Sequence, residues 1–228
     1  ANSYKDDEII YVANLWLAKT FIETQQYPKA ESLLQSLIVA TAENDKMPKY
    51  VRNNLDLVLA DYYIKTKKYE EAIRYLKNAL QKNLNKDIKA RTMFVLGQIY
   101  AYQGDNENAT EQFKSVIKKH PGYEMTFESQ MNLAKCHNSK DTTDIMKMFW
   151  KMLKDSKNIE YKDRIFYAMS DVALRRDNEE LGIKYLRNSV AASTNNNRQK
   201  VKSSLKVASM LFDNKDYVLS QAYYDTVV

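Results

Sequence analysis

The chain of 228 residues contains only four Gly and three Pro, while 44% of its residues are hydrophobic and 28% are charged. This composition is typical of a nearly all-helical globular protein and argues against both a β-sandwich and a disordered chain. The net charge of +6, from 35 basic and 29 acidic residues, is mild for this length.

No apolar run in the sequence approaches the roughly 20 residues that a membrane-spanning helix requires. A single cysteine, Cys136, excludes an intramolecular disulfide framework and a zinc site built from several cysteines. The first residues, ANSYKDDE, are not a signal peptide and are typical of a cut within a longer chain. The N-terminal sequence therefore indicates no compartment.

An internal repeat organises the chain. The phrase AIRYLKNAL at 72–80 nearly recurs as GIKYLRNSV at 182–190. Similar phrases surround six anchor residues, separated by steps of 42, 37, 37, 36 and 38: Ala30, Ala72, Ala109, Met146, Gly182 and Ser220. The sequence therefore predicts six units, the last one truncated, that begin at Tyr11, Asn53, Ala90, Phe127, Asp163 and Val201.

Within each unit the residue sizes predict two packed helices. With the anchor as position 20, position 8 is small in every unit: Ala18, Ala60, Gly97, Ala134, Ser170 and Ala208. Position 24 is always large: Leu34, Leu76, Phe113, Trp150, Leu186 and Tyr224. Small residues let two backbones approach where the helices cross, and large residues fill the flanks. Short polar breaks separate the two helices, and Gly104 is suited to end a helix in the left-handed conformation.

One segment, residues 90–123, carries a recognisable signature: Leu96, Gly97, Tyr100, Ala109, Phe113 and Pro121. At this spacing the segment resembles the tetratricopeptide repeat. The resemblance implies an all-α, right-handed α-solenoid of about six helix-turn-helix repeats with a period of 36–42 residues. The other units lack the family's Trp at position 4, and most are longer than its standard repeat. The fourth unit matches least, with Met146 at the small position and His137 at the aromatic one.

Catalytic chemistry is not expected. Cys136 and His137 are adjacent, and neighbouring helical residues point about 100° apart, so they do not form a nucleophile–base dyad. His120 lies in a turn before Pro121, and two distant histidines offer too few ligands for a zinc site. No phosphate-binding glycine loop or nucleophile elbow is present. We therefore expect no enzyme activity, no metal and no cofactor.

The family resemblance implies a concave groove lined by positions 2, 5, 9, 12 and 13 of each unit. The residues carried over in this way are Leu15, Lys19, Leu57, Asp61, Arg91, Phe94, Gln98, Tyr102, Met131, Lys135, Arg164, Tyr167, Asp171, Arg175 and Lys202. Basic and acidic side chains alternate around them. A phosphate backbone needs one dominant sign of charge, so the groove is predicted to bind a protein or peptide segment and no nucleic acid. The carboxylate clamp of the chaperone-binding members is not expected, since the first unit has Leu15 and Lys19 in its place.

Two alternatives remain at this point. One is a helical-repeat module that binds nucleic acid through the charge of +6, and the other is an accessory domain of an enzyme whose catalytic part lies outside this chain. The salt dependence of binding separates the nucleic-acid module from the predicted protein-binding scaffold, because phosphate contacts give a steep logarithmic slope and protein contacts a shallow one.

A narrower resemblance concerns the phrases PGYEMTFESQMNLAKC, STNNNRQK and DYVLSQAYYDTVV. They are similar to phrases of the tetratricopeptide lipoproteins that support type IX secretion and gliding motility. The resemblance implies a scaffold in the periplasm, associated with the outer membrane through a lipid anchor outside this chain; the alternative is a cytoplasmic protein. A monomer or weakly self-associating chain is expected.

The last helix raises a further expectation. Leu219, Tyr223 and Val227 recur at spacings of four and predict an apolar stripe. Terminal units of solenoids need a polar outer face, so we expect the natural chain to continue past Val228 with a helix that covers this stripe.

Overall fold

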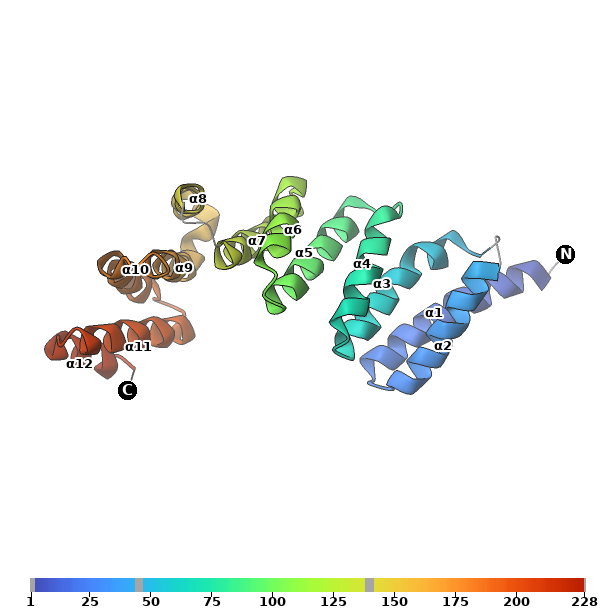
Figure 1. Cartoon of the computed structure of the whole chain (residues 1–228), viewed down its shortest axis with the longest axis horizontal. Coiled ribbons are helices and arrows are strands. Elements are labelled where there is room, and N and C mark those ends of the chain that lie inside the picture. The colour runs from blue at the N-terminus through green and yellow to red at the C-terminus, as the bar shows by residue number, and fades with distance from the viewer. Residues whose placement is uncertain (1–2, 44–46, 138–141, 228) are drawn as a thin grey trace. The chain divides into compact units, whose positions relative to one another are not determined.

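The computed structural model describes residues 3–43, 47–137 and 142–227, and these contain helices and no strand (Figure 1). In chain order the helices are α1 (Ser3–Glu23), α2 (Tyr27–Glu43), α3 (Lys49–Lys65), α4 (Tyr69–Gln81), α5 (Lys86–Tyr102), α6 (Asn106–Lys119), α7 (Tyr123–Cys136), α8 (Thr143–Lys154), the 3₁₀ helix η1 (Ser156–Tyr161), α9 (Lys162–Leu174), α10 (Glu179–Ala192), α11 (Asn197–Asp213) and α12 (Tyr217–Asp225). The predicted all-α fold is confirmed.

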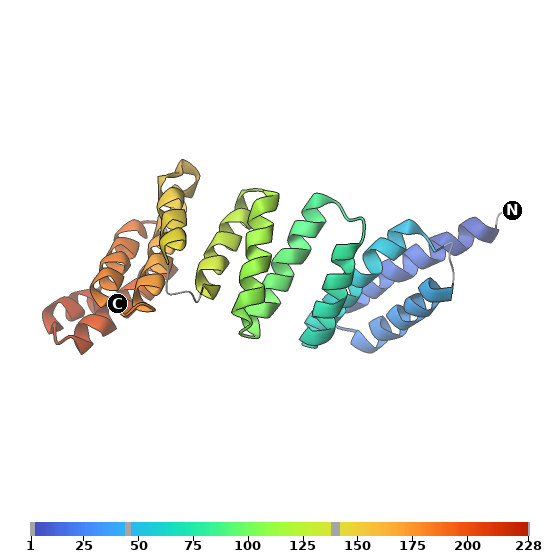
Figure 2. The same ribbon diagram turned by 45° about the horizontal axis from the view of Figure 1, so that its top comes forward.

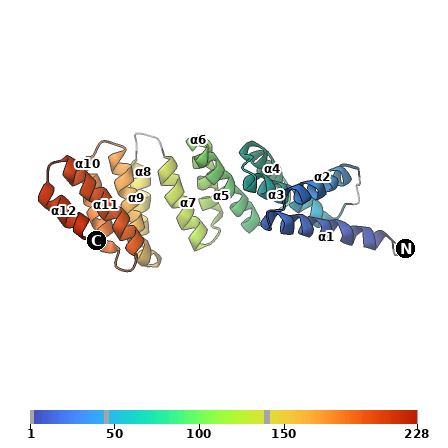
Figure 3. The same cartoon turned by 90° about the horizontal axis from the view of Figure 1, so that it is seen from below.

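Consecutive helices pair as hairpins. In the first half of the chain α1 packs on α2, α3 on α4 and α5 on α6, and the turned view shows the last two pairs side by side (Figure 2). In the second half α9 packs on α10 and α11 on α12 (Figure 3). Successive hairpins also contact one another within each half, since α3 packs on α1 and α2, α5 packs on α4, and α11 packs on α10 and α9. These are the contacts expected of stacked helical repeats.

The chain separates into two compact units, residues 1–126 and residues 127–228. Each has its own helical hairpins and its own buried residues. A continuous right-handed array of six repeats therefore remains a prediction from the sequence.

Polar side chains fix where several helices begin. Asn85 accepts a hydrogen bond from the backbone N–H of Ile88 at 2.8 Å, and Asp105 accepts one from Asn108 at 3.1 Å. Asn178, Asn196 and Asp216 cap α10, α11 and α12 in the same way. Each cap satisfies one of the free N–H groups of the first helical turn.

The small residues predicted at the helix crossings are buried. Ala18, Ala60, Ala134 and Ala208 are at most 1% exposed. At Gly97 an added Cβ would lie 2.9 Å from a ring carbon of Phe113, which is itself fully buried. The crossing of α5 and α6 therefore depends on the absence of a side chain at this position.

The fourth predicted unit differs from its expected register. Ile145, Phe149 and Met152 are buried, whereas Trp150, predicted as the large core residue, is 47% exposed. The buried set has spacings of four and three, so it forms one stripe of α8. Since Met146 and Trp150 have the same spacing as Ile145 and Phe149, the sequence offers two adjacent stripes, and the prediction chose the wrong one.

A buried polar network joins α9, α10 and α11. Asp163 is 1% exposed, and its Oδ2 accepts hydrogen bonds from Asn196 Nδ2 at 2.9 Å and from Ser193 Oγ at 3.3 Å. Ser189 Oγ donates to the Asp163 carbonyl at 2.7 Å and lies 2.7 Å from Ser203 Oγ. Asn196 therefore both caps α11 and holds a buried carboxylate.

Five hairpin turns contain a residue in the left-handed region. These are Gln25 (φ 59°), Lys67 (φ 61°), Gly104 (φ 80°), Asp177 (φ 57°) and Lys215 (φ 65°). The left-handed conformation predicted for Gly104 is confirmed, and four turns adopt it with a side chain present.

The apolar stripe predicted on the last helix is only partly exposed. Leu219 is 41% exposed, but Tyr223 packs against the cluster of Leu186, Val207 and Leu211. One member of the stripe is therefore partly buried against this cluster. None of the described helices combines the length and the apolar character needed to cross a membrane.

Candidate functional site

Two of the predicted groove residues are core residues. Leu15 is 0% exposed and belongs to a cluster with Ala18 and Ile22, and Met131 is 4% exposed. Because α1 packs directly on α2 and α3, the stripe carrying Leu15 faces neighbouring helices. Leu15 and Met131 are therefore corrected from groove residues to packing residues.

In residues 127–228 most predicted groove charges pair with neighbouring helices. Arg164 on α9 makes an ion pair with Glu128 on α7 at 2.8 Å, and its guanidinium lies 5.1 Å from the ring centre of Phe127. Asp171 on α9 pairs with Lys206 on α11 at 2.6 Å. These contacts join α9 to α7 and to α11, so their first role is to hold these helices together.

Two further predicted residues of this unit, Arg175 and Lys202, follow the same pattern. Arg175 donates hydrogen bonds to the carbonyl oxygens of Ala134 at 2.6 Å and Lys135 at 3.3 Å, near the C-terminal end of α7. The ammonium of Lys202 lies 4.2 Å from the ring centre of Tyr167, which packs against the core. Lys135 is exposed on α7. A ligand would have to displace several of these contacts to use this face.

On α5 the predicted residues diverge. Phe94 is half-buried and packs edge-on against Phe113, with ring centres 5.8 Å apart. Gln98 is exposed, and Tyr102 is 75% exposed with its ring 5.1 Å from that of Tyr69 on α4. Phe94 is therefore mainly structural, whereas Gln98 and Tyr102 are free to meet solvent or a partner.

The structure brings Lys19, Leu57, Asp61 and Arg91 together in residues 1–126. They line two adjoining pockets along α3, of about 340 Å³ between α1 and α3 and about 370 Å³ between α3 and α5. We call these the paired pockets. The first pocket is lined by Trp16, Lys19, Glu23, Asn54, Leu57, Val58 and Asp61. The second is lined by Glu23, Leu57, Ala60, Asp61, Ile64, Leu76, Ile88, Arg91, Thr92 and Val95. Glu23, Leu57 and Asp61 line both.

An aromatic platform forms the edge of the first pocket. Trp16 is 54% exposed and stacks on Tyr50, with ring centres 6.4 Å apart and planes 16° apart. The ammonium of Lys19 lies 4.1 Å from the Trp16 ring centre, within range of a cation–π interaction. The sequence reasoning missed Trp16 because it stands at position 6, outside the family's groove positions. The residue type could have drawn attention to this position, since a Trp that lies beside an apolar core stripe and is exposed is uncommon.

Burial dominates the electrostatics around Asp61. Burial raises the pKa of the Asp61 carboxyl, and Glu23 raises it further, while Lys65, Lys19 and Arg91 act in the opposite direction. Burial also lowers the pKa of Lys19, against the influence of Asp61. No described residue donates a hydrogen bond to the Asp61 carboxylate, and the nearby ion pair joins Lys65 to Glu23 at 3.4 Å. Asp61 is thus a partly desolvated acid with unused acceptor capacity.

This electrostatic arrangement predicts a stabilising substitution. The folded-state pKa of Asp61 lies above its ordinary value of 3.8, so ionisation of this group opposes folding. The cost of ionising Asp61 is absent at pH values below its pKa in the unfolded chain. It is fully present at pH values above its pKa in the folded chain. Asp61→Asn is therefore expected to raise the melting temperature by a few degrees at most at neutral pH, with no effect near about pH 3.

The matched control is Glu111→Gln, which removes one negative charge from an exposed site on α6. It is expected to leave the melting temperature nearly unchanged at both pH values. A lower melting temperature of Asp61→Asn at neutral pH would show that the Asp61 carboxylate stabilises the fold.

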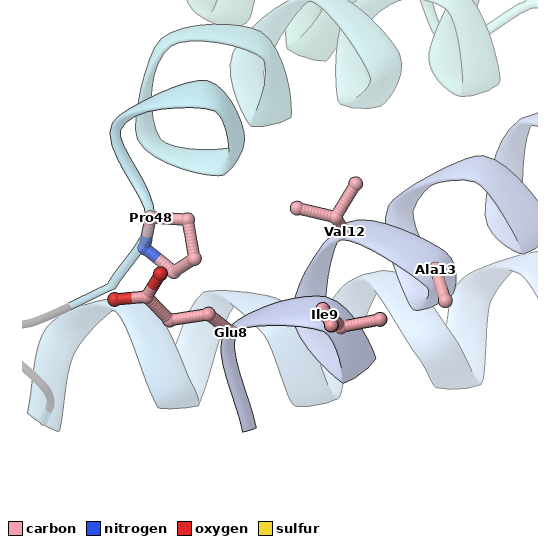
Figure 4. Close-up of a pocket in the computed structure, with 5 residues that line it drawn as sticks. All are labelled: Glu8, Ile9, Val12, Ala13 and Pro48. Carbon is pink, nitrogen blue, oxygen red and sulfur yellow. The ribbon is translucent and has the colours of Figure 1, made fainter. Parts of the chain in front are cut away.

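A larger pocket of about 520 Å³ lies at the N-terminal half of α1 (Figure 4). Ile9, Val12 and Ala13 line it from α1, Pro48 lines it from the start of α3, and Glu8 points its carboxylate toward Pro48. With a single charged group it offers few directional contacts, so the paired pockets are the better candidate site. In the part of the chain that the structure describes, His, Cys, Asp and Glu side chains form no group of three or more suited to a metal ion.

Comparison with known proteins agrees with this geometry. Residues 52–119, which cover most of α3 through α6, match the sequence profile of the tetratricopeptide repeat. This segment is therefore similar to tetratricopeptide repeats. It includes Leu57, Asp61 and Arg91 of the paired pockets, so part of the candidate site lies in the matched segment.

A curated protein that contains tetratricopeptide repeats is similar over a longer part of the chain. The tetratricopeptide-repeat-containing protein MJ1428 of Methanocaldococcus jannaschii is 26% identical over 175 residues, which is 68% of this chain. The match spans only 29% of that relative's length.

Solved structures show the same fold. The apo quorum sensor NprR from B. thuringiensis matches with a TM-score of 0.65 and 11% identity, over 96% of this chain and 64% of NprR. NprR in complex with its cognate peptide NprX matches with a TM-score of 0.53, 11% identity, and coverage of 96% and 66%. At these identities the likeness concerns the fold alone.

Proposed function

We propose that this chain is a non-enzymatic interaction scaffold that binds a segment of a protein or peptide in the paired pockets. The observation that carries the proposal is the continuous lining of the two pockets, which combines an apolar floor with charges of both signs. Peptide sites typically combine apolar anchors with a few directed polar groups. The complex of NprR with its peptide NprX shows that a protein of similar fold binds a peptide.

The lining disfavours the nucleic-acid alternative. Lys19 and Arg91 stand beside Glu23 and Asp61, so the pockets carry no dominant positive field. Phosphate backbones are bound by surfaces on which one sign of charge prevails. Binding that depends steeply on the logarithm of salt concentration would favour that alternative.

A selection from a random peptide library, displayed on phage, tests the proposal. Peptides enriched on the purified chain are expected to bind Trp16→Ala/Leu57→Ala at least about tenfold more weakly, since the double variant removes the apolar anchors of the first pocket. Trp150→Ala is the matched control, because Trp150 is an exposed aromatic residue of α8 that lines neither pocket, and its loss should leave binding within about twofold. Circular dichroism should show equal helicity for all variants.

Two outcomes contradict the proposal. One is a selection that enriches no peptide on the wild-type chain. The other is a set of peptides that bind Trp16→Ala/Leu57→Ala as tightly as the wild type.

We further propose a periplasmic, outer-membrane-associated setting in a secretion or motility assembly. The support is the resemblance of three phrases of the sequence to the lipoproteins of type IX secretion and gliding motility. Fractionation of the source cells with an antibody against this chain tests it, and recovery in the cytoplasmic fraction would contradict it.

A further inference from the structure

Charge is distributed unevenly along the paired pockets. Both pockets share two charged residues, Glu23 and Asp61, and both of these are acids. The basic residues lie to either side, with Lys19 in the first pocket and Arg91 in the second. Two carboxylates therefore meet at the junction, and each flank offers a hydrogen-bond donor.

The junction is also chemically incomplete. Asp61 is half-buried, and among the described residues no N–H or O–H donates to its carboxylate. Lys19 is held over the Trp16 ring, and Lys65 pairs with Glu23, whose side chain is 66% exposed. A desolvated carboxylate with free acceptor sites forms its strongest interaction with a cationic donor.

The surroundings of the junction are apolar. Leu57 lines both pockets, Val58 continues the floor in the first, and Ile64 and Leu76 continue it in the second. Lys and Arg side chains place an aliphatic stem on apolar surface while the charged end meets a polar group. This combination suits a long basic side chain better than a short or acidic one.

We propose that the paired pockets recognise an extended peptide segment that carries an arginine or lysine, whose charged end lies between Glu23 and Asp61. Its aliphatic stem lies on Leu57, and acceptor groups on either side of it, backbone carbonyls or acidic side chains, meet Lys19 and Arg91. This specificity rests on the function proposed above. An acidic residue at the junction would meet the Asp61 carboxylate and the Glu23 carboxylate that already pairs with Lys65, and neither carboxylate offers it a hydrogen-bond donor. The raised pKa of Asp61, caused by burial, agrees with the assignment, because a bound cation would offset that desolvation.

The test uses the peptides enriched in the phage selection, synthesised and measured by isothermal titration calorimetry. We expect them to share an Arg or Lys, and replacement of that residue by Gln to weaken binding to the wild-type chain at least about tenfold. Asp61→Asn should weaken binding of the parent peptide by a similar factor. In Asp61→Asn the Gln peptide and the parent peptide should bind almost equally, since the two changes remove the same interaction. Glu111→Gln, which removes a charge from α6, should leave the parent affinity unchanged.

The outcomes separate this inference from the function on which it rests. Peptides that need Trp16 and Leu57 but carry an acidic or neutral residue at the sensitive position would overturn the basic-residue assignment and leave the binding function intact. Equal affinities of Asp61→Asn and Glu111→Gln for the parent peptide would likewise overturn the basic-residue assignment and leave the binding function intact. A wild-type chain that enriches no peptide would overturn both.

Discussion

Replacing Phe149 with alanine is expected to lower the free energy of unfolding by about 3–5 kcal/mol, the cost typical of removing a buried aromatic ring. Phe149 is 0% exposed and lies on the buried stripe of α8 with Ile145 and Met152. The surrounding side chains cannot close the resulting space completely, so loss of transfer energy and a residual cavity both contribute. Urea denaturation followed by circular dichroism measures the change, provided that the transition of residues 127–228 is resolved.

The adjacent residue supplies the control. Trp150 is 47% exposed and contacts Tyr185 at a ring-centre distance of 6.4 Å. Trp150→Ala is therefore expected to cost only about 1 kcal/mol, the energy of one aromatic pair. If Trp150→Ala proves more destabilising than Phe149→Ala, the register of α8 is the one predicted from the repeat.

Gly97→Leu is expected to destabilise the first unit by about 1–3 kcal/mol through overpacking. A Cβ atom attached to Gly97 would lie 2.9 Å from Phe113 Cε1 and 3.2 Å from Gln112 Cβ. Phe113 is fully buried, so its ring cannot move aside without opening the contact between α5 and α6. Thermal melts and urea titrations both report this loss.

Gln98→Leu introduces the same side chain one residue further along α5, at an exposed position. Its effect is expected to stay within about 0.5 kcal/mol, as for most surface substitutions. Equal melting temperatures for Gly97→Leu and Gln98→Leu would show that α5 and α6 do not cross closely at Gly97.

The sequence predicted the fold best where residue size alone determines packing. In the α5–α6 hairpin, the small residues Gly97 and Ala109 and the large residue Phe113 allow only one assignment of the buried face. All three residues are buried. In α8 the adjacent residues Phe149 and Trp150 satisfy the same spacing on neighbouring stripes. Which of the two stripes is buried depends on contacts with neighbouring helices. The sequence of one repeat does not specify those contacts.

The candidate site was harder to predict because charges acquire their roles from other helices. Arg164 and Arg91 occupy the same repeat position, yet Arg164 pairs with Glu128 at 2.8 Å while Arg91 is exposed at a pocket. Asp61 was predicted as a groove acid, but its partial burial depends on how α1, α3 and α5 pack. Position within a repeat indicates which side chains share a face, and tertiary packing decides which of them remain available.

The left-handed turn residues have a consequence for engineering. Gln25, Lys67, Asp177 and Lys215 adopt positive φ with a side chain, at a cost of roughly 1–2 kcal/mol per residue relative to glycine. All four lie in hairpin turns and none lines the paired pockets. The chain therefore contains several independent positions at which glycine would favour the native turn while leaving the proposed recognition surface unaltered. Thermostability and ligand recognition should consequently be adjustable separately in this protein, a property that suits helical-repeat domains used as modular binding reagents.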